Sequence, residues 1–116
     1  MTVLTIAVDA GVATLTMNRP DKRNAMNDAL LEAIEAFFTR PPEGVRVAIL
    51  TGTAGHYCSG LDLSEHVARD AEGTMRHSRN WHRIMELVQF GGLPVVSAMF
   101  GAVIGGGLEL AAATHV

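Results

Sequence analysis

The chain has 116 residues, of which 48% are hydrophobic and 18% charged, and its formal net charge is −3. This length supports one compact domain with its own hydrophobic core and is too short for two. The slightly acidic balance argues against a nucleic-acid-binding protein, whose phosphate contacts need a basic face.

The first two apolar-rich runs predict a β-hairpin. Residues 3–8 and 12–17 carry the hydrophobic side chains, and the short turn between them contains Gly11. Glycine supplies the positive φ that such turns need. A polar, proline-containing loop follows at residues 18–24.

A helix is predicted next, because Asn27 or Asp28 can act as its N-cap. Hydrophobic residues then recur at helical spacing until Pro41 and Pro42 end the pattern. They are Leu30, Leu31, Ile34, Phe37 and Phe38. Residues 45–52 form an apolar run that predicts a buried strand. The first half of the chain is therefore interpreted as a ββα unit followed by a further strand.

The second half repeats the order of loop, helix and strand. A small-residue loop covers residues 52–60, and a short polar helical stretch is expected from Ser64. A longer helix is predicted from Met75 to Phe90, with Trp81 on its apolar face. The apolar run 95–100 predicts a buried strand, and a helix is expected to begin near Gly107.

Three successive glycines, Gly105 to Gly107, lie between this strand and the start of the helix. Glu109 follows Gly106 by about one helical turn. Glycines let another molecule approach the peptide groups closely, and the first amides of a helix have no internal partners. Such amides can receive an anion or a polarised carbonyl oxygen. The alternative is a tight turn followed by a Glu that only favours the helix dipole.

Cellular setting and length lead to further expectations. A single cysteine, Cys58, cannot form an internal disulfide and is typical of a reducing, cytoplasmic protein. Residues 1–9 lack the basic region of a secretory leader, and Gly91, Gly92 and Pro94 interrupt the apolar stretch around Leu93. No membrane span is therefore expected. The last helical pattern reaches Val116 without a cap or turn signal, so a truncated chain is expected.

Four stretches in this order resemble the crotonase superfamily, the enoyl-CoA hydratase/isomerase family. They cover essentially the whole chain: residues 17–20 with 24–26, residues 48–52, residues 57–63 (Tyr-Cys-Ser-Gly-Leu-Asp-Leu), and residues 94–101 with 105–110 (Gly-Gly-Gly-Leu-Glu-Leu). The resemblance implies an α/β crotonase-like spiral of ββα units, of which residues 1–116 would be the N-terminal part. It also implies assembly into trimers or dimers of trimers.

The resemblance implies an oxyanion site built from two backbone N–H groups, those of Leu61 and Gly106. Such donors stabilise the negative charge that develops on a thioester oxygen. Glu109 matches one of the two glutamates with which hydratases add water across a double bond. The second glutamate would lie beyond Val116. Without the resemblance, Leu61 would be interpreted as a packed leucine and Glu109 as a capping residue.

Further residues are expected to contact the substrate, an acyl-CoA thioester. Arg23 with its neighbour Lys22 could meet phosphates, and the alternative for both is a solvated surface loop. The remaining candidates, Ala25, Ser59, Gly60 and Gly105, belong to the matching loops. Asp62 is also expected to contact the substrate, although a carboxylate after a turn more often accepts hydrogen bonds from backbone amides. His82 is also included, with a hydrogen-bonded histidine on a helix face as its alternative. No metal site and no cofactor are expected besides coenzyme A as part of the substrate.

Three functions stay open at this point. The first is hydration of 2-enoyl-CoA by a complete chain. The second is another crotonase reaction, such as isomerisation, thioester hydrolysis or dehalogenation, because fold alone does not choose among them. The third is a catalytically silent fragment that serves assembly.

Overall fold

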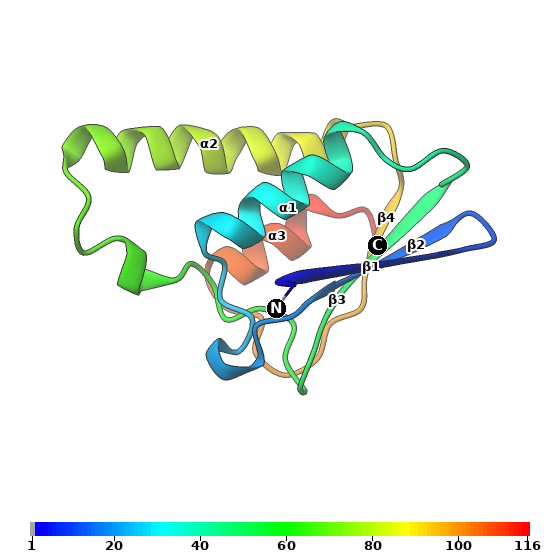
Figure 1. The fold of residues 1–116 in the computed structure, drawn as a ribbon, viewed down its shortest axis with the longest axis horizontal. Helices are drawn as coiled ribbons and strands as arrows, with labels where there is room; N and C mark the ends of the chain where they lie inside the picture. Colours follow the sequence, from blue (N-terminus) through cyan, green and yellow to red (C-terminus); the bar gives the residue numbers. More distant parts are fainter. Residues whose placement is uncertain (1) are drawn as a thin grey trace.

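The computed structural model describes residues 2–116, and within this range the strands form one mixed sheet (Figure 1). The order is β1 (Leu4–Asp9), β2 (Val12–Met17), β3 (Val47–Gly52) and β4 (Val95–Ser97). The predicted hairpin is confirmed: β1 and β2 are antiparallel, and Gly11 in their turn has φ +81°. β3 pairs in parallel with β2 and with β4.

Helices connect the parallel strands. α1 (Asp28–Thr39) joins β2 to β3, α2 (Ala71–Phe90) joins β3 to β4, and α3 (Gly106–Ala113) follows β4. Figure 1 shows these helices on one side of the sheet, with α2 as an outer layer that packs on α1 and α3. None of the helices in residues 2–116 has both the length and the apolar character to cross a bilayer.

The core lies between the sheet and the helices. Residues of β2 and β3 alternate between buried and half-buried, because successive side chains point to opposite faces of a strand. The helical pattern predicted for α1 is confirmed, and its apolar stripe is buried against the sheet. The fully buried members include Leu15, Met17, Leu30, Ile34 and Leu50.

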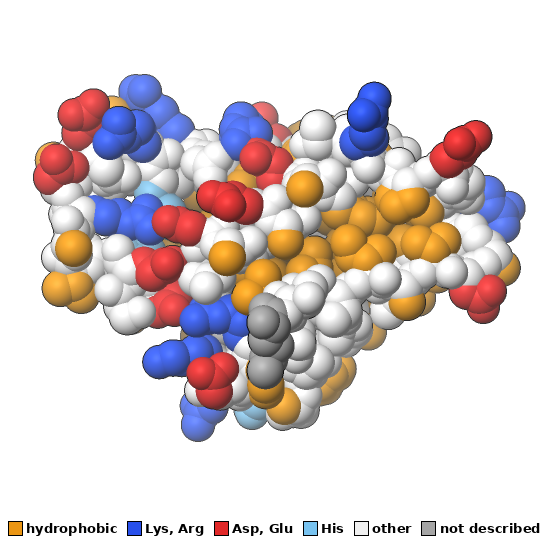
Figure 2. All heavy atoms as spheres, in the orientation of Figure 1, with side chains coloured by type: hydrophobic (Ala, Val, Ile, Leu, Met, Phe, Trp, Pro, Cys, Tyr) orange, Lys and Arg blue, Asp and Glu red, His pale blue; other side chains and the backbone are white. Residues whose placement is uncertain are grey.

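Part of the helix-facing side of the sheet is uncovered. Ile6 pairs with Leu15 in the hairpin register, so both side chains belong to the same face. Leu15 is fully buried, whereas Ile6 and Val8 are about half exposed. Figure 2 shows the resulting apolar surface over the hairpin, beyond the end of α1.

Two predicted boundaries were wrong. α2 begins at Ala71 rather than Met75, because the Asp70 side chain accepts a hydrogen bond from the Gly73 amide (2.7 Å) and caps the helix there. The strand predicted over residues 95–100 ends at Ser97. The chain then leaves the sheet because Phe100 and Ala102 pair with the loop after β3 instead.

Smaller differences concern the other helices. The polar stretch at Ser64 forms only a 3-10 turn, η2 (Leu63–Glu65). A second 3-10 turn, η1 (Pro20–Lys22), lies in the polar loop after β2. Of the two caps expected for α1, Asn27 is the one used, since its side chain accepts from the Leu30 amide. α3 starts at Gly106, one residue before the expected position.

The parallel pairing of β3 with β4 places the functional loops. Because the strands run in the same direction, the loops that follow them leave the sheet at the same edge. Residues 53–62 and 98–106 are therefore neighbours, although α2 separates them in sequence.

Candidate functional site

The loops after β3 and β4 are joined by backbone hydrogen bonds. The Tyr57 amide donates to the Phe100 carbonyl (2.9 Å), and the Cys58 amide donates to the Ala102 carbonyl (3.0 Å). The Ile104 amide in turn donates to the Cys58 carbonyl (3.1 Å). This short parallel ladder fixes the spacing of the two turns that follow it, one at Leu61 and one at Gly106.

The Leu61 amide is directed away from the loop that precedes α1. Met26 and Leu61 form an isolated parallel bridge, in which the Met26 amide donates to Gly60 and the Asp62 amide donates to Met26. In such a bridge the central residue's own N–H faces the opposite side. Within residues 2–116 that N–H has no hydrogen-bond partner.

The Gly106 amide lies beside it. Gly106 is the first residue of α3, and its N–H has no partner in the described part of the chain. A Cβ atom at Gly106 would lie 3.4 Å from the Leu61 nitrogen, and a Cβ at Gly60 would lie 3.6 Å from the Gly106 nitrogen. The two amides are thus spatial neighbours, one of them at the positive end of a helix dipole.

Glycine is required at both turns. Gly60 has φ +114°, and a Cβ there would lie 3.0 Å from the Ile104 carbonyl oxygen. A Cβ at Gly107 would lie 2.2 Å from the Cys58 carbonyl oxygen, closer than any real contact. The close approach of the two loops therefore explains glycine at positions 60 and 107. Gly105, at φ +54°, has open space around it.

Trp81 of α2 packs against the glycine turn at Gly106. Its side chain is 5% exposed, and its Cη2 atom would lie 3.2 Å from a Cβ at Gly106. The apolar position of Trp81 on its helix was predicted, but its contact with the glycine turn was not. Only the packing of α2 on α3 brings the two together.

Glu109 lies in the first turn of α3, and its side chain is exposed. Its amide donates to the Gly105 carbonyl (3.0 Å), which supports the turn. In residues 2–116 no basic side chain forms an ion pair with this carboxylate.

The loop before α1 lies beside the Leu61 turn. The Ser59 amide donates to the Arg23 carbonyl, and the Ser59 hydroxyl donates to the Lys22 carbonyl, both at 3.0 Å. The Arg23 side chain is exposed to solvent. The Ala25 carbonyl is occupied, because it accepts from the Arg19 guanidinium (2.6 Å).

Asn24 is a fully buried residue of this loop that sequence reasoning did not single out. Its side-chain amide donates to the carbonyls of Thr53 (3.1 Å) and His56 (2.8 Å), and its oxygen accepts from the Arg19 amide (2.8 Å). Asn24 has φ +59°, a conformation that asparagine tolerates better than most residues. That preference was the available signal for a structural asparagine.

The Asp62 carboxylate accepts a hydrogen bond from a backbone amide, which is the alternative given for it above. It accepts from the Ser64 hydroxyl (2.6 Å) and amide (3.1 Å) and pairs with the Arg19 guanidinium at 3.1 Å. The Ser64 hydrogen bond, and then Arg19, hold the pKa of the Asp62 carboxyl below its usual value. This carboxylate is engaged within the protein rather than open to a ligand.

The candidate His82 is exposed, and the single cysteine is inert. The His82 ring is on the exposed side of α2, where its Nδ1 atom lies 2.7 Å from the Ser78 carbonyl oxygen. The Cys58 thiol is fully buried, and burial raises its pKa, which disfavours the reactive thiolate. Among residues 2–116, no three His, Cys, Asp or Glu side chains gather as metal ligands would.

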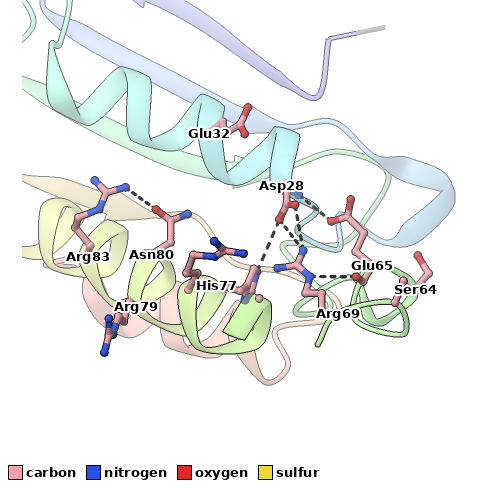
Figure 3. Close-up of a pocket in the computed structure, with 12 residues that line it drawn as sticks. Asp28, Glu32, Ser64, Glu65, Arg69, His77, Arg79, Asn80 and Arg83 are labelled. Carbon is pink, nitrogen blue, oxygen red and sulfur yellow. Dashed lines mark hydrogen bonds and ion pairs between the residues drawn. The ribbon is translucent and has the colours of Figure 1, made fainter. Parts of the chain in front are cut away.

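A charged groove of about 940 Å³ lies elsewhere, between α1, η2 and the first half of α2. Figure 3 shows Arg69 and His77 directed toward Asp28 at the start of α1. Arg69 contacts both Asp28 carboxylate oxygens at 3.0 Å. The groove is lined by an internal ion-pair network, and the glycine turns do not contribute to it.

Comparisons with known proteins give one family. The family model described as "Enoyl-CoA hydratase/isomerase" matches residues 7–116. The chain is 31% identical over 119 residues to a "Probable enoyl-CoA hydratase" of Bacillus subtilis, covering 100% of this chain and 46% of that protein. It is 34% identical over 117 residues to the 2,3-dehydroadipyl-CoA hydratase of Escherichia coli, covering 96% and 44%.

Solved structures agree with this similarity. The crystal structure of a "putative enoyl-CoA hydratase" from Rhodopseudomonas palustris superposes with a TM-score of 0.93 at 44% identity, covering 98% of this chain and 44% of that one. The enoyl-CoA hydratase of Bacillus anthracis superposes with a TM-score of 0.90 at 29% identity, covering 97% and 45%. The chain thus spans about half the length of the relatives that it matches.

Proposed function

Because this chain belongs to the enoyl-CoA hydratase/isomerase family, we propose that it contributes the oxyanion site of an acyl-CoA enzyme with the crotonase fold. In this proposal the N–H groups of Leu61 and Gly106 donate to the carbonyl oxygen of a thioester. When a nucleophile adds to the conjugated double bond, negative charge moves onto that oxygen as an enolate, and the two donors stabilise it.

The observation that carries the proposal is the pair of neighbouring amides without partners. Most backbone N–H groups inside a folded protein are paired, so two neighbouring unpaired ones, at half-buried Leu61 and buried Gly106, favour an external acceptor. Preorganised donors of this kind contribute about 2.7–4 kcal/mol each to transition-state stabilisation in other enzymes. The dipole of α3 adds to the effect at Gly106.

The reaction that we propose is the hydration of a 2-enoyl-CoA. Glu109 projects from the same helix that presents the Gly106 amide, and its carboxylate has no partner in residues 2–116. A carboxylate at this place can take a proton from the attacking water or deliver one to the α-carbon. A second glutamate, which hydratases of this family use, would come from a segment beyond residue 116.

Further parts of the proposal concern the substrate and the assembly. The Arg23 and Lys22 side chains, which belong to the exposed loop beside Ser59, would meet the phosphates of coenzyme A. The complete enzyme would form trimers or dimers of trimers in the cytoplasm, where a free buried thiol such as Cys58 stays reduced.

Replacing Glu109 tests the reaction. In the protein expressed from its natural reading frame, we expect Glu109→Gln to lower kcat for crotonyl-CoA hydration by about 10²–10⁴-fold, since general acid–base catalysis contributes this much. Glu43→Gln serves as the matched control, because Glu43 is exposed in the loop before β3, at the end of the sheet opposite to the glycine turns. Hydration removes the conjugation between the double bond and the thioester, so loss of the ultraviolet absorbance of the conjugated thioester follows the reaction.

Other outcomes would select another function. An unchanged kcat in Glu109→Gln, with full hydration, removes Glu109 from the reaction. Double-bond migration or release of free coenzyme A without hydration indicates isomerisation or thioester hydrolysis at the same oxyanion site. A protein that binds no acyl-CoA supports the assembly role.

A further inference from the structure

His56 lies at the point where the two functional loops meet. Its backbone carbonyl accepts from the buried Asn24 side chain (2.8 Å), and its amide donates to the Thr53 carbonyl (3.3 Å). The residue is therefore held in place from the loop before α1 and from the end of β3.

The ring of His56 makes a contact across to the other loop. Its Nδ1 atom lies 2.9 Å from the amide nitrogen of Ala102. The carbonyl oxygen of the same residue, Ala102, accepts from the Cys58 amide (3.0 Å). Ala102 therefore forms one hydrogen bond through its carbonyl oxygen to the main chain and another through its amide to the His56 side chain.

The packing at Gly101 shows that this contact is built into the fold. Gly101 has φ +60°, and a Cβ there would lie 2.6 Å from the His56 Nδ1 atom and 2.0 Å from the Gly55 carbonyl oxygen. Any other residue at position 101 would displace the ring. Glycine at 101 and histidine at 56 therefore form a matched pair.

The chemistry of the contact fixes the protonation of the ring. A backbone N–H can only donate, so Nδ1 must accept and carry no proton, and the proton of the neutral ring is on Nε2. A backbone amide inside this short ladder has no carbonyl partner to replace the imidazole. If the ring were lost, the half-buried Ala102 amide would have no acceptor among the described residues.

We propose that His56 is a positioning residue for the oxyanion site: by accepting from the Ala102 amide in its Nε2–H form, it sets the segment that delivers Gly106 beside Leu61. The inference rests on the proposed function. It adds a residue that touches no substrate and acts through the main chain four residues before the Gly106 donor. A small displacement of such a donor has a large effect on rate, because electrostatic stabilisation depends on the distance and direction from the N–H group to the developing negative charge.

The experiment compares variants of the protein expressed from its natural reading frame. Asn at position 56 can keep an acceptor near the place of Nδ1, whereas Gln carries its oxygen one methylene further out and Leu has none. We expect His56→Leu and His56→Gln to lower kcat for crotonyl-CoA by roughly 10–100-fold with KM changed less than about threefold. His56→Asn should recover to within about threefold of the parent.

The matched control is His115→Leu. The His115 Nδ1 atom also accepts from a backbone amide, that of Val95 (2.9 Å), but beyond the far end of α3. That variant should lose stability without a change in kcat. If His56→Leu fails to fold, the comparison of Asn with Gln still decides.

Long-range ¹H–¹⁵N NMR of the imidazole rings gives a second readout. We expect His56 to show a protonated Nε2 and an unprotonated Nδ1. A proton on Nδ1, or equal kcat in all three His56 variants of an active enzyme, overturns the inference and leaves the proposed function intact. A parent protein that converts no acyl-CoA overturns the proposed function, and the role of His56 falls with it.

Discussion

The Asp62 carboxylate shows how a single residue can look like a ligand group and serve the scaffold. It follows the Leu61 turn directly, yet its oxygens are occupied by Ser64 and by the Arg19 guanidinium. Arg19 also donates to the Ala25 carbonyl, so one cation ties the loop before α1 to the loop after β3. Charge-assisted bonds of this type are stronger than neutral ones.

We expect Asp62→Asn to lower the free energy of unfolding by about 1–3 kcal/mol, because Arg19 loses its charged partner. The pKa of Asp62 is lowered in the folded state. Its contribution is therefore present above the ordinary pKa near 3.8 and is lost as the pH falls through the lower folded-state value. Urea titrations at neutral and acidic pH test both points. Asp21→Asn, which changes an exposed carboxylate in η1, should have no effect.

At the scale of elements, an ion-pair cluster attaches the segment between β3 and α2 to the start of α1. Arg69 pairs with Asp28 through both carboxylate oxygens, and the Glu65 side chain accepts from the Asp28 amide (2.9 Å). His77 of α2 packs edge-on against His66, with ring centroids 4.7 Å apart. This junction holds η2 in place after the Leu61 turn.

Acid should loosen this junction. Burial, and then the nearby charges of Arg69 and His66, lower the pKa of His77, against the opposing effects of Asp28 and Glu65. The unfolded chain therefore binds the proton more readily, so stability is full above about pH 6.5 and is lost as the pH falls from there toward the folded-state pKa.

Unfolding in urea at pH 7.5 and pH 5.5 measures this dependence. We expect His77→Gln to flatten it, whereas His82→Gln, on the exposed side of the same helix, should leave it unchanged. A dependence that persists in His77→Gln would assign the titration to another group.

At the scale of the whole molecule, Cys58 lies where the loops after β3 and β4 pack against α3. Its side chain is fully buried, its main chain belongs to the ladder between the two loops, and its carbonyl lies against Gly107 of α3. A reagent can reach the buried thiol only if the loop that carries Cys58 separates from α3 and from the loop after β4. Labelling of Cys58 should therefore report global unfolding rather than local motion.

We expect a disulfide reagent such as DTNB to react with folded Cys58 at least about 10³-fold more slowly than with the urea-unfolded chain, given the usual stability of a domain. The raised pKa of the thiol acts in the same direction. Fast labelling of the folded protein would mean that the two loops open independently of the core. The rate is followed by absorbance in increasing urea.

Local sequence patterns were sufficient for the elements whose signals are local. The turn at Gly11, the Asn27 cap and the apolar stripe of α1 were predicted because each depends on residues within a few positions of one another. The start of α2 and the end of β4 were missed. The cap at Asp70 precedes a glycine that weakens the helical pattern, and the end of β4 depends on a loop more than 40 residues away.

The sequence by itself determined the order of strands and helices, the glycine turns and the family resemblance, because backbone preferences and apolar periodicity act over short distances. Only the tertiary structure decided that the amides of Leu61 and Gly106 are neighbours, that Trp81 lies against Gly106, and that Asn24 and His56 form hydrogen bonds within the same loops. The physical reason is that parallel pairing of β3 with β4 brings together loops that the length of α2 keeps far apart along the chain.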